Sequence, residues 1–141
     1  MTSRPTPTLE TPPARIVDRA NRPFWDAIDA GRFVLARCRC GAHYARLQAC
    51  LSCQAGAHAM RWVSAAGDGN VRSFVIFDKA YHPYFDGLLP YVVAIVTLVE
   101  GPEILTNVID VEPAAVRIGM PVRIVIAERR GQNIHQASAR Y

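Results

Sequence analysis

Two cysteine pairs, Cys38-Arg39-Cys40-Gly41 and Cys50-Leu51-Ser52-Cys53, decide how this chain is interpreted. They contain all four cysteines of the protein, in the spacing C-x-C-G-x8-C-x2-C. Two short pairs at this separation allow two turns to face each other around one ion, and thiolates suit the tetrahedral coordination of zinc. The pattern therefore predicts a zinc ribbon in which one Zn²⁺ per chain is held by Cys38, Cys40, Cys50 and Cys53.

Two alternatives stay open for these cysteines: a disulfide pair, or a ribbon without this metal set. Disulfides are disfavoured because residues 1–15 contain no apolar segment typical of a secretory signal, and cytoplasmic thiols stay reduced. His43 and His58 are near enough in sequence to replace a cysteine ligand. Each is also typical of an ordinary loop histidine.

Composition limits the class of protein. With 141 residues, half of them hydrophobic, the chain has room for one ordinary domain and a small appendage. The longest apolar run, residues 91–99, is far shorter than the ~18 residues of a membrane span. The net charge of +4 fits either an anionic partner or a solvated basic surface, since the cations are scattered. We expect a cytoplasmic protein with no membrane segment.

The chain divides into four parts. Residues 1–14 are rich in proline and threonine and are expected to form a flexible arm. Residues 15–31 are expected to be helical, residues 32–61 to form the ribbon, and residues 62–141 to form a β domain.

Two adjacent aromatic residues, Phe24 and Trp25, give the helical segment a large apolar surface. Pro23 suits a first helical turn, and Gly31 suits a helix end. The aromatic surface requires a groove, which either this chain or another subunit provides, including a second copy in a homodimer.

The β domain shows five segments that alternate or are apolar throughout, separated by turn residues. A single helical turn is expected at residues 112–115, between the third and fourth strands. This layout is typical of the OB-fold, a small Greek-key barrel. The predicted fold class is mainly β: an N-terminal helix, a rubredoxin-like zinc ribbon and a five-stranded OB-fold barrel. The expected strands are residues 71–77, 91–99, 103–109, 122–127 and 134–139.

A long loop, residues 79–90, joins the first two barrel strands and is rich in aromatic residues. OB-folds use loops of this kind for ligands, and aromatic side chains are common interface anchors. His82 lies four residues before Asp86, so an acid–base role for this histidine is an alternative. We expect the loop to contact a ligand or partner through Tyr81, His82, Tyr84 and Phe85.

The order of these segments resembles a known family: the zinc-ribbon OB-fold proteins associated with acyl-CoA metabolism, long catalogued as a domain of unknown function. The resemblance covers about residues 20–139. Its marks are Pro23-Phe24-Trp25, Gly31, Cys40-Gly41, the Cys50/Cys53 pair, Trp62, Gly67-x-Gly69-x-Val71, Leu89-Pro90-Tyr91-Val92-Val93-Ala94, Glu100-Gly101-Pro102 and Ile118-Gly119-Met120-Pro121-Val122.

This resemblance implies a non-catalytic accessory subunit of a thiolase-fold enzyme: a thiolase, a lipid-transfer-protein-type aldolase or an acyltransferase. The thiolase-like partner would carry the catalytic groups, while this chain holds the complex together and helps to bind the acyl-CoA thioester. The family tends to have Pro-Pro-Arg between the cysteine pairs, and here Ala45-Arg46 stands in that region. Arg46 is therefore expected to contact ligand or partner.

Two other functions compete with this one. A single-stranded nucleic-acid binder would use Arg72, Phe74 and Arg123, although no basic stripe interleaved with aromatic residues is present. A stand-alone acyl-CoA binder would place arginines near the phosphates, because the planar guanidinium bonds two oxygens at once. The candidates for that role are Arg37, Arg39, Arg46 and Arg61.

Overall fold

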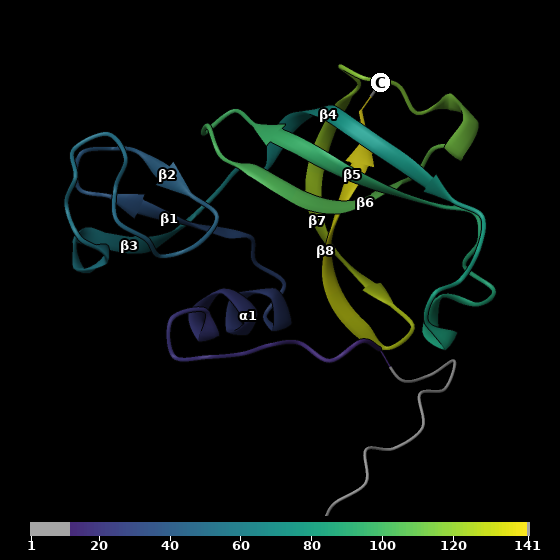
Figure 1. The fold of residues 1–141 in the computed structure, drawn as a ribbon, viewed down its shortest axis with the longest axis horizontal. Helices are drawn as coiled ribbons and strands as arrows, with labels where there is room; N and C mark the ends of the chain where they lie inside the picture. Colours follow the sequence, from purple (N-terminus) through teal and green to yellow (C-terminus); the bar gives the residue numbers. More distant parts are fainter. Residues whose placement is uncertain (1–11, 141) are drawn as a thin grey trace, which may run out of the picture.

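A computed structural model describes residues 12–140 and shows a helix, a small sheet and a barrel side by side (Figure 1). The expected flexible arm, residues 1–14, lies mostly outside the described residues. The predicted fold class is confirmed: one helix, a three-stranded sheet that carries the cysteines, and a five-stranded barrel. No helix formed by residues 12–140 is both long and apolar enough to cross a membrane.

Helix α1 (Arg22–Asp29) is shorter than the predicted helical segment. Just before it, Asp18 and Asn21 bond each other reciprocally, each backbone N–H donating to the other's side-chain oxygen at 2.8 Å. This closed turn replaces helical hydrogen bonds, so the helix begins only after it. The expected signals at its two ends are confirmed, since a proline occupies the first turn and Gly31 follows the helix with φ +79°.

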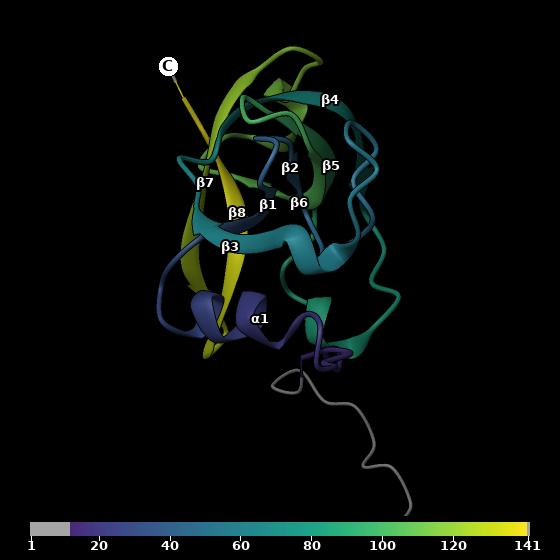
Figure 2. The same ribbon diagram turned by 90° about the vertical axis from the view of Figure 1, so that its left-hand side faces the viewer.

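The small sheet has the strand order β2-β1-β3 (Figure 2). Its central strand pairs antiparallel with both neighbours, and Ala36 lies opposite Tyr44 on one side and Trp62 on the other. The single-turn helix η1 (Ala57–Ala59) leads into the third strand. The strands are β1 (Val34–Cys38), β2 (His43–Tyr44) and β3 (Met60–Ser64).

The barrel closes in the order β4-β5-β6-β8-β7 and back to β4. All its pairs are antiparallel except β6 with β8, which is the arrangement of a five-stranded Greek-key OB barrel. Single-turn helices η2 (Pro83–Phe85) and η3 (Pro113–Ala115) lie in its loops, the second of them where a helical turn was expected. The strands are β4 (Asp68–Phe77), β5 (Tyr91–Leu98), β6 (Glu103–Ile109), β7 (Pro121–Arg129) and β8 (Gln132–Ala139).

The barrel core is made by alternate residues of its strands, and every second residue of β5 is buried. Gly69 shows how tightly the strands approach: a Cβ at this position would lie 2.5 Å from the carbonyl oxygen of Thr97. Helix α1 adds Ile28 to the same core. A separate, smaller cluster of Ala36, Cys38, Cys50 and Met60 lies inside the ribbon.

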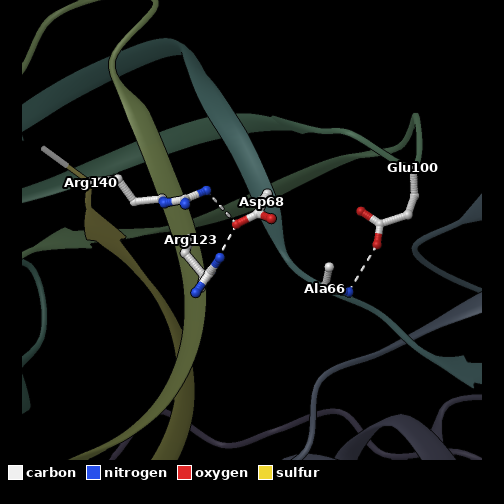
Figure 3. Close-up of polar contacts among 5 residues, drawn as sticks. All are labelled: Ala66, Asp68, Glu100, Arg123 and Arg140. Atoms are coloured by element: carbon white, nitrogen blue, oxygen red, sulfur yellow. Dashed lines mark hydrogen bonds and ion pairs between the residues drawn. The ribbon is translucent and has the colours of Figure 1, made fainter.

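The junction between ribbon and barrel, residues 65–67, is fixed by hydrogen bonds. The backbone N–H of Ala65 donates to the Phe33 carbonyl at 3.0 Å, and that of Ala66 donates to the Glu100 carboxylate at 3.1 Å (Figure 3). The carbonyl of Gly67 accepts from the backbone N–H of Ile124 at 2.9 Å. Each junction residue is therefore attached to a neighbouring element.

Strand β4 begins at Asp68, whose polar contacts are shown beside the junction in Figure 3. Oδ1 of Asp68 accepts from Arg123 of β7 and from Arg140, both at 2.8 Å. These bonds hold the pKa of the Asp68 carboxyl below its usual value, with the Arg123 hydrogen bond the largest cause. The contact ties β4 to β7 and to the chain after β8, where the barrel closes.

Candidate metal centre

The four cysteines lie on two turns that the backbone forms independently. In the first turn, the N–H of Gly41 donates to the Cys38 carbonyl at 2.8 Å, and Gly41 has φ +99°. In the second, the N–H of Gln54 donates to the Cys50 carbonyl at 2.9 Å. Glycine adopts such a left-handed conformation without strain, which explains its place directly after Cys40.

The turns bring all four sulfur atoms together. The ligand atoms of Cys38, Cys40, Cys50 and Cys53 lie within 4.8 Å of one another. The Sγ–Sγ distances are 3.6 Å for Cys38–Cys53 and 3.6 Å for Cys40–Cys50, too long for disulfide bonds. A zinc ion with four Zn–S bonds of about 2.3 Å in tetrahedral geometry separates its sulfurs by about 3.8 Å. The cluster therefore has the donor set and size that a single metal ion such as zinc requires, despite the C-x-C spacing of the first pair.

Hydrogen bonds set different proton affinities for two of the thiols. A contact with the Tyr44 hydroxyl, helped by the backbone amides of Cys53 and Ser52, lowers the pKa of Cys50 to about 6. The Ala42 amide favours the Cys40 thiolate, but the neighbouring Cys50 sulfur and the other cysteines outweigh it and raise the pKa of Cys40 to about 11. Sulfurs this close resist full ionisation together, which a cation among them would relieve.

The two histidines considered as substitute ligands are not part of the cluster, which consists of the four cysteines alone within the described chain. His43 instead lines a surface groove with Arg46, between the ribbon and the β5–β6 turn. The candidate contact residue Arg46 therefore faces the ribbon–barrel groove. Arg37 and Arg61 lie opposite each other on exposed positions of β1 and β3, and Arg39 is also exposed.

The aromatic pair of the helix packs within its own chain. The Phe24 ring lies 5.1 Å from Trp25, 6.0 Å from Trp62 of the ribbon and 5.6 Å from His135 of β8. Arg15 covers the Trp25 ring at 4.4 Å. These contacts place both rings against residues of the same chain.

The aromatic loop contains residues with separate roles. Tyr81 is 74% exposed, whereas Tyr84 is fully buried and its hydroxyl donates to the Arg129 carbonyl at 2.7 Å. His82 Nδ1 accepts the backbone N–H of Tyr84 at 3.1 Å and so caps helix η2. Phe85 stacks on Tyr91 at 4.9 Å. The loop thus exposes Tyr81 for contact, while His82 has a local structural partner.

The arginines considered for nucleic acid are engaged by carboxylates. Arg72 pairs with Glu103, and Arg123 shares the Asp68 carboxylate with Arg140. This arrangement does not favour a phosphate backbone as partner.

Two residues that the sequence did not single out have central positions. Tyr44 contacts Cys50 through its hydroxyl, which also accepts the Leu51 N–H at 2.8 Å. Arg129 lies over the rings of Tyr84 and Phe85 at 5.4 and 5.2 Å. The neighbouring Arg130 contacts the same loop, donating to the carbonyls of Tyr84 and Asp86 at 2.7 Å each.

Comparisons with known proteins agree with this architecture. Residues 62–127 match the family described as the C-terminal OB-fold domain of ChsH2. A chain of the Ltp2-ChsH2(DUF35) aldolase has the same fold, with a TM-score of 0.77 and 30% identity, over 89% of this chain and 98% of that chain.

Two curated proteins are also similar. A "Probable enoyl-CoA hydratase alpha subunit" of Thermomonospora curvata is 34% identical over 112 residues, which cover 78% of this chain and 34% of that protein. A "DUF35 domain-containing scaffold protein" of Methanothermobacter thermautotrophicus is 32% identical over 65 residues, which cover 46% of this chain and 48% of that protein. The chain spans about a third and about half of the length of these two relatives.

The resemblance noted from the sequence is thereby confirmed along nearly the whole length of a solved relative. This chain combines a four-cysteine ribbon with an OB barrel, and the structural likeness covers 89% of it. The chain belongs to the ChsH2-type DUF35 family.

Proposed function

We propose that this protein is a non-catalytic scaffold subunit that binds a thiolase-fold enzyme, such as an Ltp2-type aldolase, and supports its action on acyl-CoA thioesters. The observation that carries the proposal is the likeness to the DUF35 chain of an Ltp2-ChsH2 aldolase, which extends over 98% of that chain. The relative in Methanothermobacter thermautotrophicus is itself named a scaffold protein.

The described side chains support a scaffold rather than an enzyme. The four cysteines are gathered at the metal centre, and His82 is hydrogen-bonded to the backbone of its own loop. A nucleophile and an adjacent base are what acyl transfer requires of a catalytic chain. Similarity to a hydratase subunit covers only 34% of that protein, so hydratase chemistry there can reside in the remainder.

The metal centre has a structural role in this proposal. We assign one Zn²⁺ per chain to Cys38, Cys40, Cys50 and Cys53, where it would fix the two turns of a ribbon whose own buried cluster is small. A closed four-thiolate site leaves no open position for a substrate and contributes folding energy instead.

The test is co-expression of the full chain with a thiolase-fold protein from the same genome, followed by native mass spectrometry and an acyl-CoA cleavage or condensation assay. We expect a stable complex with one zinc per chain of this protein, and activity that requires the complex. His82→Ala should leave that activity intact, whereas a substitution of the partner's nucleophile should abolish it. A chain that stays alone with every such candidate, or that turns over an acyl-CoA by itself, would overturn the proposal.

A further inference from the structure

A cavity of ≈ 250 Å³ opens at the end of the barrel where the aromatic loop meets strands β5, β6 and β7. Most of its lining is apolar, and Arg129 is the charged residue among the side chains described there. The lining includes Phe85, Val92, Asn107, Val108, Val111 and Arg129.

The guanidinium of Arg129 is held in place by neutral groups. Nη1 donates to Oδ1 of Asn107 at 2.7 Å, and Nε donates to the Tyr84 hydroxyl at 3.3 Å. The Phe85 ring lies 5.2 Å below it. Asn107 is in turn fixed by donating its amide N–H to the Val92 carbonyl at 3.0 Å. The cation is thus oriented before any ligand arrives, which reduces the ordering cost of binding.

The charge of Arg129 is not balanced inside the described chain. The ion pairs among residues 12–140 involve Arg15, Arg72, Arg123 and Arg140, and none includes Arg129. Its side-chain hydrogen bonds within residues 12–140 use Nε and Nη1, so Nη2 has no acceptor among these residues. A half-buried guanidinium with an open N–H beside an apolar cavity is suited to an external anion.

From this geometry we propose that the cavity binds a small amphipathic carboxylate, whose headgroup bonds Arg129 and whose apolar body contacts Val92, Val108 and Val111. A single cation favours a monoanion over a polyphosphate. A volume of ≈ 250 Å³ holds roughly eight heavy atoms, taking about 30 Å³ for each as for liquid water. A carboxylate of six carbons has this size. The inference concerns the barrel alone and is independent of the proposed scaffold function.

The experiment measures binding of sodium hexanoate to the full-length protein by titration, followed with methyl NMR signals of Val92, Val108 and Val111. We expect saturable shifts of these methyl groups, and affinity that falls roughly fourfold for each methylene removed. Hexanamide, which has the same shape without the charge, should bind at least tenfold more weakly. Equal binding of the acid and the amide would overturn the proposal, because Arg129 would then contribute no recognition.

Variants separate recognition from folding. Arg129→Gln should remove the preference for hexanoate over hexanamide, whereas Arg129→Lys should retain part of it. Arg72→Gln, an exposed residue of β4 outside the cavity, is the matched control and should bind as the wild type does. If the Arg129 variants unfold, Val111→Phe tests the same cavity by filling it and should reduce hexanoate binding at least tenfold. Hexanoate affinity that is unchanged in both Val111→Phe and any folded Arg129 variant would contradict the assignment.

Discussion

The hydroxyl oxygen of Tyr44 lies 3.4 Å from Sγ of Cys50 and accepts the backbone N–H of Leu51 at 2.8 Å. One side chain therefore connects strand β2 to the second cysteine turn. Groups that bond a metal ligand orient it, and their loss commonly weakens metal binding 10- to 100-fold. Tyr44→Phe keeps the ring and removes both bonds, so we expect roughly tenfold weaker zinc binding at neutral pH, measured by competition with a chromophoric chelator. Tyr81→Phe, at an exposed position outside the ribbon, is the control and should not change zinc affinity.

Removal of the metal should unfold the ribbon before the barrel. The ribbon's own buried cluster contains only four residues, whereas the barrel core is extensive. Chelation should therefore accelerate amide hydrogen exchange in β1 and β3 by orders of magnitude and leave β5 protected. Cys53→Ser should reproduce the effect, while Ser52→Ala should not. Uniform loss of protection in ribbon and barrel would show instead that the two fold as one unit.

His135 gives the protein a specific acid sensitivity. It lies among the rings of Phe24, Trp25 and Phe33, and burial lowers its pKa to about 4. The unfolded chain, with an ordinary pKa near 6.5, binds the proton first. Stability is therefore fully present above about pH 6.5 and falls by up to roughly 3 kcal/mol as pH drops to about 4. Unfolding in urea at several pH values between 7.5 and 4 measures how the free energy of unfolding changes with pH.

Substitution of His135 tests whether this histidine causes the dependence of the free energy of unfolding on pH. His135→Gln should be nearly insensitive to pH between 6.5 and 4, although it loses packing and is less stable at pH 7. His58→Gln, at an exposed position of the ribbon, should keep the wild-type profile. A wild-type slope in His135→Gln would assign the acid sensitivity to other groups.

The carboxyl of Asp68 should stabilise the barrel at neutral pH. Its pKa is lowered by Arg123 and Arg140, so the contribution is present above the ordinary carboxyl pKa and is lost as pH falls through the lowered value. Asp68→Asn should lower the melting temperature at pH 7 and approach the wild type near pH 2. Asp78→Asn, an exposed loop acid, is the comparison and should change little. An equal melting temperature for Asp68→Asn and the wild type at pH 7 would contradict a role in barrel closure.

Gly69 should not tolerate a side chain. A Cβ there would lie 2.5 Å from the Thr97 carbonyl oxygen and 2.9 Å from the Val96 side chain. The nearer contact is with the backbone of Thr97, which cannot move aside as a flexible side chain could. Gly69→Ala should destabilise the protein by about 1–3 kcal/mol in chemical denaturation, as overpacking does elsewhere. Ser73→Ala, on the exposed side of the same strand, should change stability by less than about 0.5 kcal/mol.

The sequence predicted the ribbon and barrel because both depend on local patterns. Cysteine turns and alternating strands can each be recognised from a few consecutive residues. The five expected strands lie within β4 to β8 or differ from them by one residue at an end. Helix α1 starts later than expected because the bond between Asp18 and Asn21 competes with helix formation. Tyr44 and Arg129 were missed because their roles depend on contacts that the folded chain creates, Arg129 with a loop 45 residues away. His82 lies in the aromatic loop expected from the sequence, but its hydrogen bond to Tyr84 was not evident from spacing.

The junction of residues 65–67 fixes the distance between the surface of the ribbon and the surface of the barrel. Ala65, Ala66 and Gly67 are each bonded to a different part of the chain, so the ribbon and barrel present their surfaces at a fixed offset rather than swinging about a hinge. One inserted residue in this junction would move one surface relative to the other by up to about 3.3 Å. An assembly that contacts both surfaces would therefore tolerate substitutions on either one more readily than a change in the length of the junction that joins them.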